Sequence, residues 1–105
     1  MLDIYGVSLG VLEGLRPVLA EIERRDVDLA RQLRRASSSI ALNLAEGSSS
    51  QGRNRRARYF NAMGSARETR ACLEVAQALG YVERVEAAVA DKLDRVLGTL
   101  HKLTR

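Results

Sequence analysis

The chain has 105 residues, 46% of them hydrophobic, which is enough for one domain with a buried core and too short for several. It has three Tyr, one Phe and no Trp, so the core must be aliphatic, and the Leu-, Ala-, Arg- and Glu-rich composition favours helices over a sheet. The net charge of +4 is uneven: residues 1–30 have three arginines and six acids (−3), residues 31–70 nine arginines and two acids (+7), and residues 71–105 five of each sign (0).

Apolar residues at helical spacing predict a first helix over residues 2–24. Gly6, Gly10 and Gly14 each cost about 1 kcal/mol relative to Ala, and Pro17 removes a backbone hydrogen bond and predicts a kink. Only tertiary packing could hold such a helix. The glycines recur every four residues, so they form a smooth line where another helix could approach closely.

A second helix is expected to begin with Asp26 or Asp28 as its cap and to end near Glu46. Gly47 suits the left-handed position that follows a helix. The outer side of this helix is basic in its first half and apolar in its second, where Leu42 is predicted to face outward between small residues.

Two further helices are predicted over residues 53–79 and 83–103, after a polar connection at residues 48–52. Gly80 is the expected stop between them. Small residues lie on several sides of the third helix, which indicates packing on more than one side. The predicted fold is all-α: residues 1–105 form a single antiparallel up-down-up-down four-helix bundle.

The N-terminal stretch is apolar but has no basic leader, and Asp3 and Glu13 interrupt it. We therefore expect neither a signal peptide nor a membrane span. The single cysteine, Cys72, cannot form an internal disulfide, which is typical of a reduced, cytoplasmic protein.

A phosphate-binding loop is tested first among catalytic sites. Gly47 and Gly52 have the glycine spacing of that motif, but Arg53 and Asn54 stand where it needs Lys and Ser or Thr. The preceding segment is predicted to be a helix rather than a strand. Nucleotide hydrolysis is therefore disfavoured.

Metal and nucleophile chemistry are disfavoured as well. His101 is the only histidine, so the Glu-x-x-His pairs of a bundle metal site are missing. Cys72 and the serine clusters at 37–39 and 48–50 have no base near them in the sequence. We expect no enzyme activity, no cofactor and no metal.

The end of the second helix carries two polar residues, Asn43 and Glu46, beside its apolar seam. A carboxylate is poorly placed against the helix dipole there unless it accepts amide hydrogen bonds or pairs with an arginine such as Arg70. Our hypothesis is a structural polar network in which these residues tie the helix to the next loop, with Glu68 as a further member. The alternative is two half-exposed polar residues.

Arginines concentrate on the second and third helices, and antiparallel packing would bring many of them partly together. Such a patch can neutralise phosphates without reading bases. Salt bridges to the acidic first helix of a neighbouring chain would explain it as well. The candidate nucleic-acid-binding residues are Arg31, Arg34, Arg35, Arg53, Arg55, Arg56 and Arg58.

Residues 32–47, QLRRASSSIALNLAEG, resemble the signature of the four-helix-bundle or 23S rRNA-intervening-sequence protein family, roughly Q-[IL]-R-R-A-x-x-S-I-x-x-N-[IL]-A-E-G. The family has a second block, a basic stretch followed by G-S-x-x-E and later by L-G-Y. Residues 53–58, 64–68 and 79–81 resemble these three parts in turn. Ala66, Thr69 and Arg70 depart from that pattern, since many members have larger aliphatics at the first two positions and an acid at the third.

The resemblance implies an antiparallel four-helix bundle that assembles into a homopentameric ring. Some members are encoded within intervening sequences of large-subunit ribosomal RNA genes. A related branch, the accessory variability determinants of diversity-generating retroelements, binds a reverse transcriptase and nucleic acid. The resemblance implies no enzymatic activity.

Two functions follow as hypotheses. The first is a non-enzymatic, oligomeric bundle whose arginine patch binds RNA, DNA or a nucleic-acid-handling protein such as a reverse transcriptase. The second is an assembly or adaptor protein that binds no nucleic acid and whose arginines pair between subunits. Neither hypothesis involves a membrane.

Overall fold

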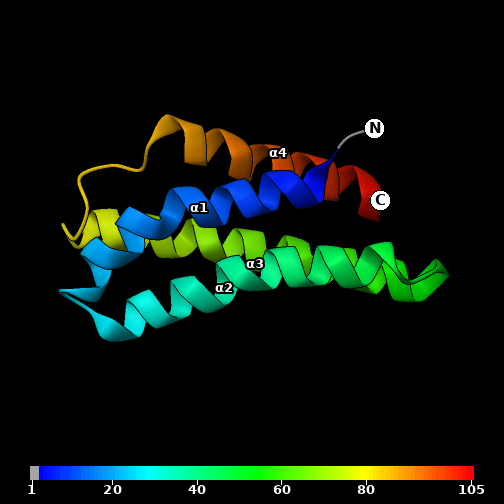
Figure 1. Cartoon of the computed structure of the whole chain (residues 1–105), viewed down its shortest axis with the longest axis horizontal. Helices are drawn as coiled ribbons and strands as arrows, with labels where there is room; N and C mark the ends of the chain where they lie inside the picture. Colours follow the sequence, from blue (N-terminus) through cyan, green and yellow to red (C-terminus); the bar gives the residue numbers. More distant parts are fainter. Residues whose placement is uncertain (1–2) are drawn as a thin grey trace.

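A computed structural model describes residues 3–105 as a bundle of four helices (Figure 1). The helices are α1 (Ile4–Glu23), α2 (Val27–Ser48), α3 (Gly52–Ala78) and α4 (Ala87–Thr104). α1 packs against α2 and α4, and α3 packs against the same two helices, so the four form a closed square. Successive helices run antiparallel, so the start of α1 and the end of α4 lie at the same end of the bundle. The all-helical, up-down-up-down prediction is confirmed.

The core is aliphatic, and most of its large members come from α1, α2 and α4. Leu15, Ile22 and Leu33 are fully buried. α3 contributes mostly small side chains, so α2 can approach it closely, and these two helices form the most extensive pair in the bundle. The small buried residues of α3 are Ala62, Ala66, Thr69 and Ala76.

The close approach predicted at the glycines of α1 is confirmed at two of them. A Cβ on Gly14 would lie 2.5 Å from Val89 Cγ2, and one on Gly10 would lie 3.2 Å from Lys92 Cδ, so both glycines let α4 pack against the α1 backbone. Pro17 lies within α1, which continues to Glu23.

Local signals at two helix ends act as predicted. The side chain of Asp26 accepts a hydrogen bond from Leu29 N (2.9 Å) and caps α2. Gly80 has a φ of +77°, and Tyr81 N donates to Ala76 O at 2.9 Å, which closes α3 in the glycine-terminated form. The Tyr81 hydroxyl also donates to Asp26 Oδ2 (3.2 Å), so the two connections at this end of the bundle are joined.

The predicted end of α2 is wrong. α2 continues through Gly47 to Ser48, and Gly47 is buried with an ordinary helical φ. A Cβ there would lie 2.5 Å from Tyr59 Cε1. Gly47 is therefore needed because the Tyr59 ring packs on the α2 backbone, and not because the chain turns at it.

The predicted start of α4 is also wrong, because the helix begins at Ala87 and not near residue 83. Residues 83–86 lie outside any helix, and Gln77 Nε2 donates to the Glu83 carbonyl (3.4 Å). Val82 and Val85 still pack against the core, from a connection and not from a helix.

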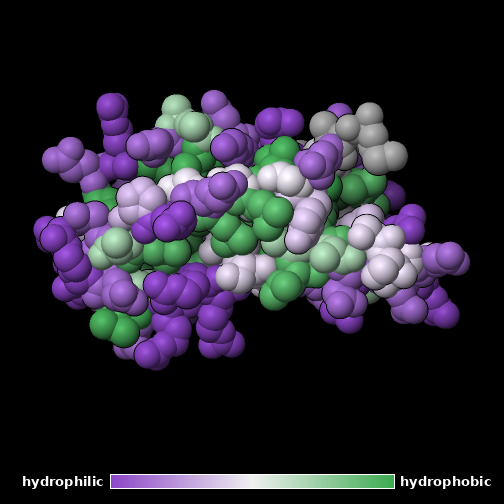
Figure 2. Space-filling view, in the orientation of Figure 1, coloured by the Kyte–Doolittle hydropathy of each residue, from purple (hydrophilic) through white to green (hydrophobic). Residues whose placement is uncertain are grey.

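Apolar side chains also reach the surface. Figure 2 shows a strip of them along the face formed by α1 and α2, bordered by hydrophilic side chains. Leu42 is 66% exposed, Tyr5 44% and Leu9 38%. The outward position predicted for Leu42 is confirmed. No helix in residues 3–105 is long and apolar enough to span a membrane.

Two glycines on facing helices should respond to alanine in opposite ways. Gly47→Ala is expected to lower the free energy of unfolding by about 1–2 kcal/mol, because the clash with Tyr59 outweighs the gain in helix propensity. Gly64→Ala is expected to raise it by about 0.5–1 kcal/mol, because no atom lies within 4 Å of the new Cβ. Urea unfolding measures both, and stabilisation by Gly47→Ala would contradict the Tyr59 contact.

Candidate nucleic-acid interface

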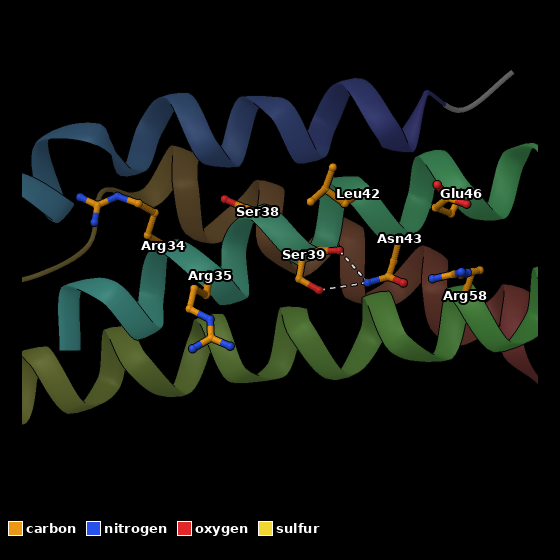
Figure 3. A pocket seen from close by; sticks show the side chains of 8 residues that line it. All are labelled: Arg34, Arg35, Ser38, Ser39, Leu42, Asn43, Glu46 and Arg58. Carbon is orange, nitrogen blue, oxygen red and sulfur yellow. Dashed lines mark hydrogen bonds between the residues drawn. The ribbon is translucent and has the colours of Figure 1, made fainter. Parts of the chain in front are cut away.

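A groove follows the outer seam between α2 and α3 and continues along α3 and the α2–α3 connection. It consists of three adjoining hollows of about 420, 450 and 540 Å³, the third lined by α3 and the connection alone. The first and second hollows share Arg35 and Ser39, and the first and third share Arg58. We call this the α2–α3 groove, and Figure 3 shows its central hollow. Its lining residues are Gln32, Arg34, Arg35, Ala36, Ser38, Ser39, Leu42, Asn43, Glu46, Ser50, Asn54, Ala57, Arg58, Asn61, Ser65 and Glu68.

A polar chain crosses the floor of this groove and links the two helices. Ser65 Oγ donates to Ser39 Oγ at 2.8 Å. Asn43 Nδ2 donates to the carbonyl and the hydroxyl of Ser39, at 2.9 and 3.0 Å (Figure 3). Both bonds of Asn43 stay within α2, so the link between the two helices is made by Ser39 and Ser65, and not by Asn43 as predicted. No pattern in the sequence marks Ser65 as a linking residue, beyond its place in the G-S-x-x-E block.

The Ser39–Ser65 bond fixes the antiparallel register, and this register separates Glu46 from Arg70. Glu46 lies at the level of Arg58, which lines the same hollow, whereas Arg70 lies further along α3 with its guanidinium 3.8 Å from Asp94 of α4. The predicted pairing of Glu46 with Arg70 is wrong for this reason.

The Glu46 side chain is predicted to link α2 to the next loop, but the link is made by the Glu46 backbone carbonyl and two serine hydroxyls. The Glu46 carboxylate has no hydrogen-bond or ion-pair partner among residues 3–105, while its backbone carbonyl accepts from Ser49 Oγ (3.1 Å) and Ser50 Oγ (2.8 Å). Glu68 lies in the groove, outside this link. Burial, followed by the charge of Glu68, raises the pKa of the nearby Cys72 thiol.

Two of the candidate arginines make ion pairs on the surface. Arg31 lies 3.5 Å from Asp28 on its own helix, and Arg34 lies 3.4 Å from Glu23 at the end of α1. All four side chains are at least half exposed. Such pairs contribute about 0–1 kcal/mol, so an anionic ligand could compete for either arginine.

Two other candidates hold the fold together. Arg55 Nε donates to the carbonyls of Ser50 (2.8 Å) and Gly47 (3.1 Å) and so fastens the α2–α3 connection. Arg56 Nη2 donates to Thr104 O at 2.7 Å and caps the end of α4. Its guanidinium also lies 5.5 Å from the centre of the Phe60 ring.

The remaining three arginines have no acceptor within hydrogen-bonding or ion-pair distance in the described part of the chain. Arg35 and Arg58 line the α2–α3 groove, one from each helix, and Arg53 lies outside it at the start of α3. In Figure 3 the Arg35 guanidinium extends over α3, and Arg58 lies beside Asn43. The predicted convergence is therefore partial: it joins Arg34, Arg35 and Arg58.

Comparison with known families agrees with this architecture. The family model of the 23S rRNA-intervening sequence protein matches residues 15–102. The chain belongs to this family. The match with the 23S rRNA-intervening sequence proteins extends from the middle of α1 to the last turn of α4, so it includes the whole α2–α3 groove. No curated protein and no solved structure matches the chain.

The carboxylates, thiol and imidazole of residues 3–105 do not gather into a group that could hold a metal ion. Guanidinium, hydroxyl and amide groups line the groove together with the carboxylates of Glu46 and Glu68. The guanidinium, hydroxyl and amide groups donate hydrogen bonds to anionic oxygens.

The capping role of Arg56 can be separated from any role in binding. Arg56→Ala is expected to lower the free energy of unfolding by about 1 kcal/mol, because it removes the bond to Thr104 O and the contact with Phe60. Arg53→Ala is the control and should change it by less than about 0.5 kcal/mol. Urea unfolding compares the two variants, and equal stabilities would contradict the cap.

Proposed function

We propose that this protein is a non-enzymatic helical bundle, cytoplasmic in location, that binds RNA or DNA electrostatically through the α2–α3 groove. A nucleic-acid-handling protein such as a reverse transcriptase would be a partner in the same process. The observation that carries the proposal is the pair Arg35 and Arg58, which face one groove from two helices with no acceptor among residues 3–105.

The chemistry of the pair supports this function. Arginine keeps its charge at every physiological pH and holds phosphate oxygens with a planar fork of donors. Arg35 and Arg58 lie within helices, so their backbone is already ordered and loses little conformational entropy when an anion binds. The family name, which refers to an intervening sequence of 23S rRNA, points to a nucleic-acid context for its members.

Charge reversal in the groove tests the proposal. Arg35→Glu combined with Arg58→Glu is expected to abolish binding to RNA and DNA at low salt, and even single reversals should reduce the slope of log affinity against log salt by about 1 each. Fluorescence anisotropy with labelled nucleic acids measures both quantities. Neither arginine makes a bond within the described residues, so the fold should be kept.

The matched control is Arg84→Glu with Arg95→Glu. It makes the same change in net charge on the α3–α4 connection and on α4, away from the groove. It should weaken binding far less than the groove variant does. Equal losses in both variants would mean that overall charge, and not the groove, attracts the nucleic acid.

A second candidate function, assembly through protein contacts, is favoured by a different observation. The outward side of α3 carries small residues at a spacing of seven: Ala57, Gly64, Ala71 and Ala78, all exposed. Gly64 costs about 1 kcal/mol within a helix, yet nothing in the described chain lies within 4 Å of the Cβ it lacks. Close approach by a second copy of the chain would give this smooth side of α3 a function.

The surface that would protrude into such a side is the exposed apolar side of α1 and α2, where Tyr5, Leu9 and Leu42 reach the surface. The two surfaces lie on different helices, so contact between them is head-to-tail, and head-to-tail contacts close into rings when the rotation allows it. A homopentameric ring is the assembly that the family resemblance implies. In this function the groove arginines would pair with acids of the neighbouring copy.

Leucine at the two open glycines separates assembly from folding. Gly64→Leu is expected to convert the assembly into single chains, because the new side chain fills the smooth side of α3. Gly98→Leu, at the equally open glycine of α4, is the control and should leave the mass unchanged. Light scattering at several salt concentrations measures the mass. A single-chain mass for the unmodified protein at every concentration would contradict assembly.

A further inference from the structure

The two unpartnered arginines of the α2–α3 groove are separated along its length. Arg58 lies level with Glu46, which is eleven residues beyond Arg35 on α2. At 1.5 Å per residue this places the backbones of the two arginines roughly 16 Å apart along the helix axes. A ligand that meets both side chains must therefore be extended and carry negative charge over a comparable length.

The aromatic side chains are engaged elsewhere. Tyr59 packs on Gly47, Phe60 lies under the Arg56 guanidinium, and Tyr81 donates to Asp26. Tyr5 is on α1, and none of the four lines the groove. Single strands obtain much of their affinity by stacking bases on aromatic rings, so the groove offers them little beyond charge.

The groove does offer donors suited to a sugar-phosphate backbone. Ser38, Asn54 and Asn61 line it, and their side chains make no hydrogen bond within residues 3–105. Hydroxyl and amide groups of this kind bond to phosphate oxygens and, in RNA, to the 2′-hydroxyl. They position a backbone but read no sequence from the phosphates they contact.

We propose that the α2–α3 groove takes the phosphate backbone of a double-stranded nucleic acid, held by charge and shape and independent of base sequence. This inference rests on the nucleic-acid function proposed above and names the form of the ligand. A duplex carries one charge per about 1.7 Å of its axis and is stiff over the distance between Arg35 and Arg58. A flexible single strand has half that charge density and must also be ordered to reach both arginines.

The carboxylates of Glu46 and Glu68 in the groove repel the phosphates of a nucleic acid. Removing such a charge should therefore strengthen binding, whereas removing an arginine should weaken it. Glu46 has no partner in the described residues and lies in the same hollow as Arg58. Glu46→Gln removes its repulsion and is expected to raise duplex affinity by about twofold to fivefold at low salt. Glu74→Gln, between α3 and α4, is the control and should leave the affinity unchanged.

The decisive experiment compares ligands on the unmodified protein. The probes are a 20-base-pair RNA duplex, a DNA duplex of the same sequence, their separate strands and a duplex of scrambled sequence, measured by fluorescence anisotropy at several salt concentrations. We expect at least one duplex type to bind about tenfold or more tightly than its strands, since a duplex presents twice the charge per length, and the scrambled duplex to bind equally.

Each outcome decides between the inference and the function beneath it. Single strands that bind as tightly as both duplexes, or a strong preference for one sequence, overturn the duplex inference and leave nucleic-acid binding in place. Absence of binding by every probe at low salt overturns the proposed function itself. A preference for only the RNA or only the DNA duplex supports the inference and identifies the backbone geometry that fits.

Discussion

The close approach of α2 and α3 is the constraint on which the rest of the molecule depends. It needs small side chains along the seam, so that the hydroxyls of Ser39 and Ser65 can meet at 2.8 Å and the Tyr59 ring can lie on Gly47. A bulkier residue in place of Ser39, Ser65 or Gly47 would push the two helices apart. The depth of the groove, the level of Arg58 opposite Glu46 and the shape of the α2–α3 connection all follow from this distance.

The sequence predicts well those features that are decided within a few residues. Asp26 caps α2 and Gly80 ends α3 because each acts on backbone groups of the adjacent turn. The same logic failed at Gly47, because the reason for that glycine is the Tyr59 ring, which lies on the next helix. It failed at residues 83–86 because Val82 and Val85 have a spacing that suits a helix and equally suits a connection lying over the core.

The candidate site could be predicted in composition but not in organisation. All seven arginines look alike in the sequence, yet Arg55 and Arg56 are bound to backbone carbonyls, and Arg31 and Arg34 are paired with acids. Whether an arginine is bound or unpaired depends on which carbonyl or carboxylate lies within its reach. That in turn depends on the register between the helices. Composition and periodicity do not contain the register, so Arg35 and Arg58 could not be singled out beforehand.

The positions of the tyrosines allow their own fluorescence to report the opening of the bundle. The protein has no tryptophan, so its near-ultraviolet signal comes mainly from three tyrosines. Tyr59 packs beside the α2–α3 connection and Tyr81 bonds to Asp26 at the opposite end of the bundle. With the exposed Tyr5 and one of the other two tyrosines replaced by Phe, fluorescence from the remaining tyrosine would follow the opening of a single end, with no added label.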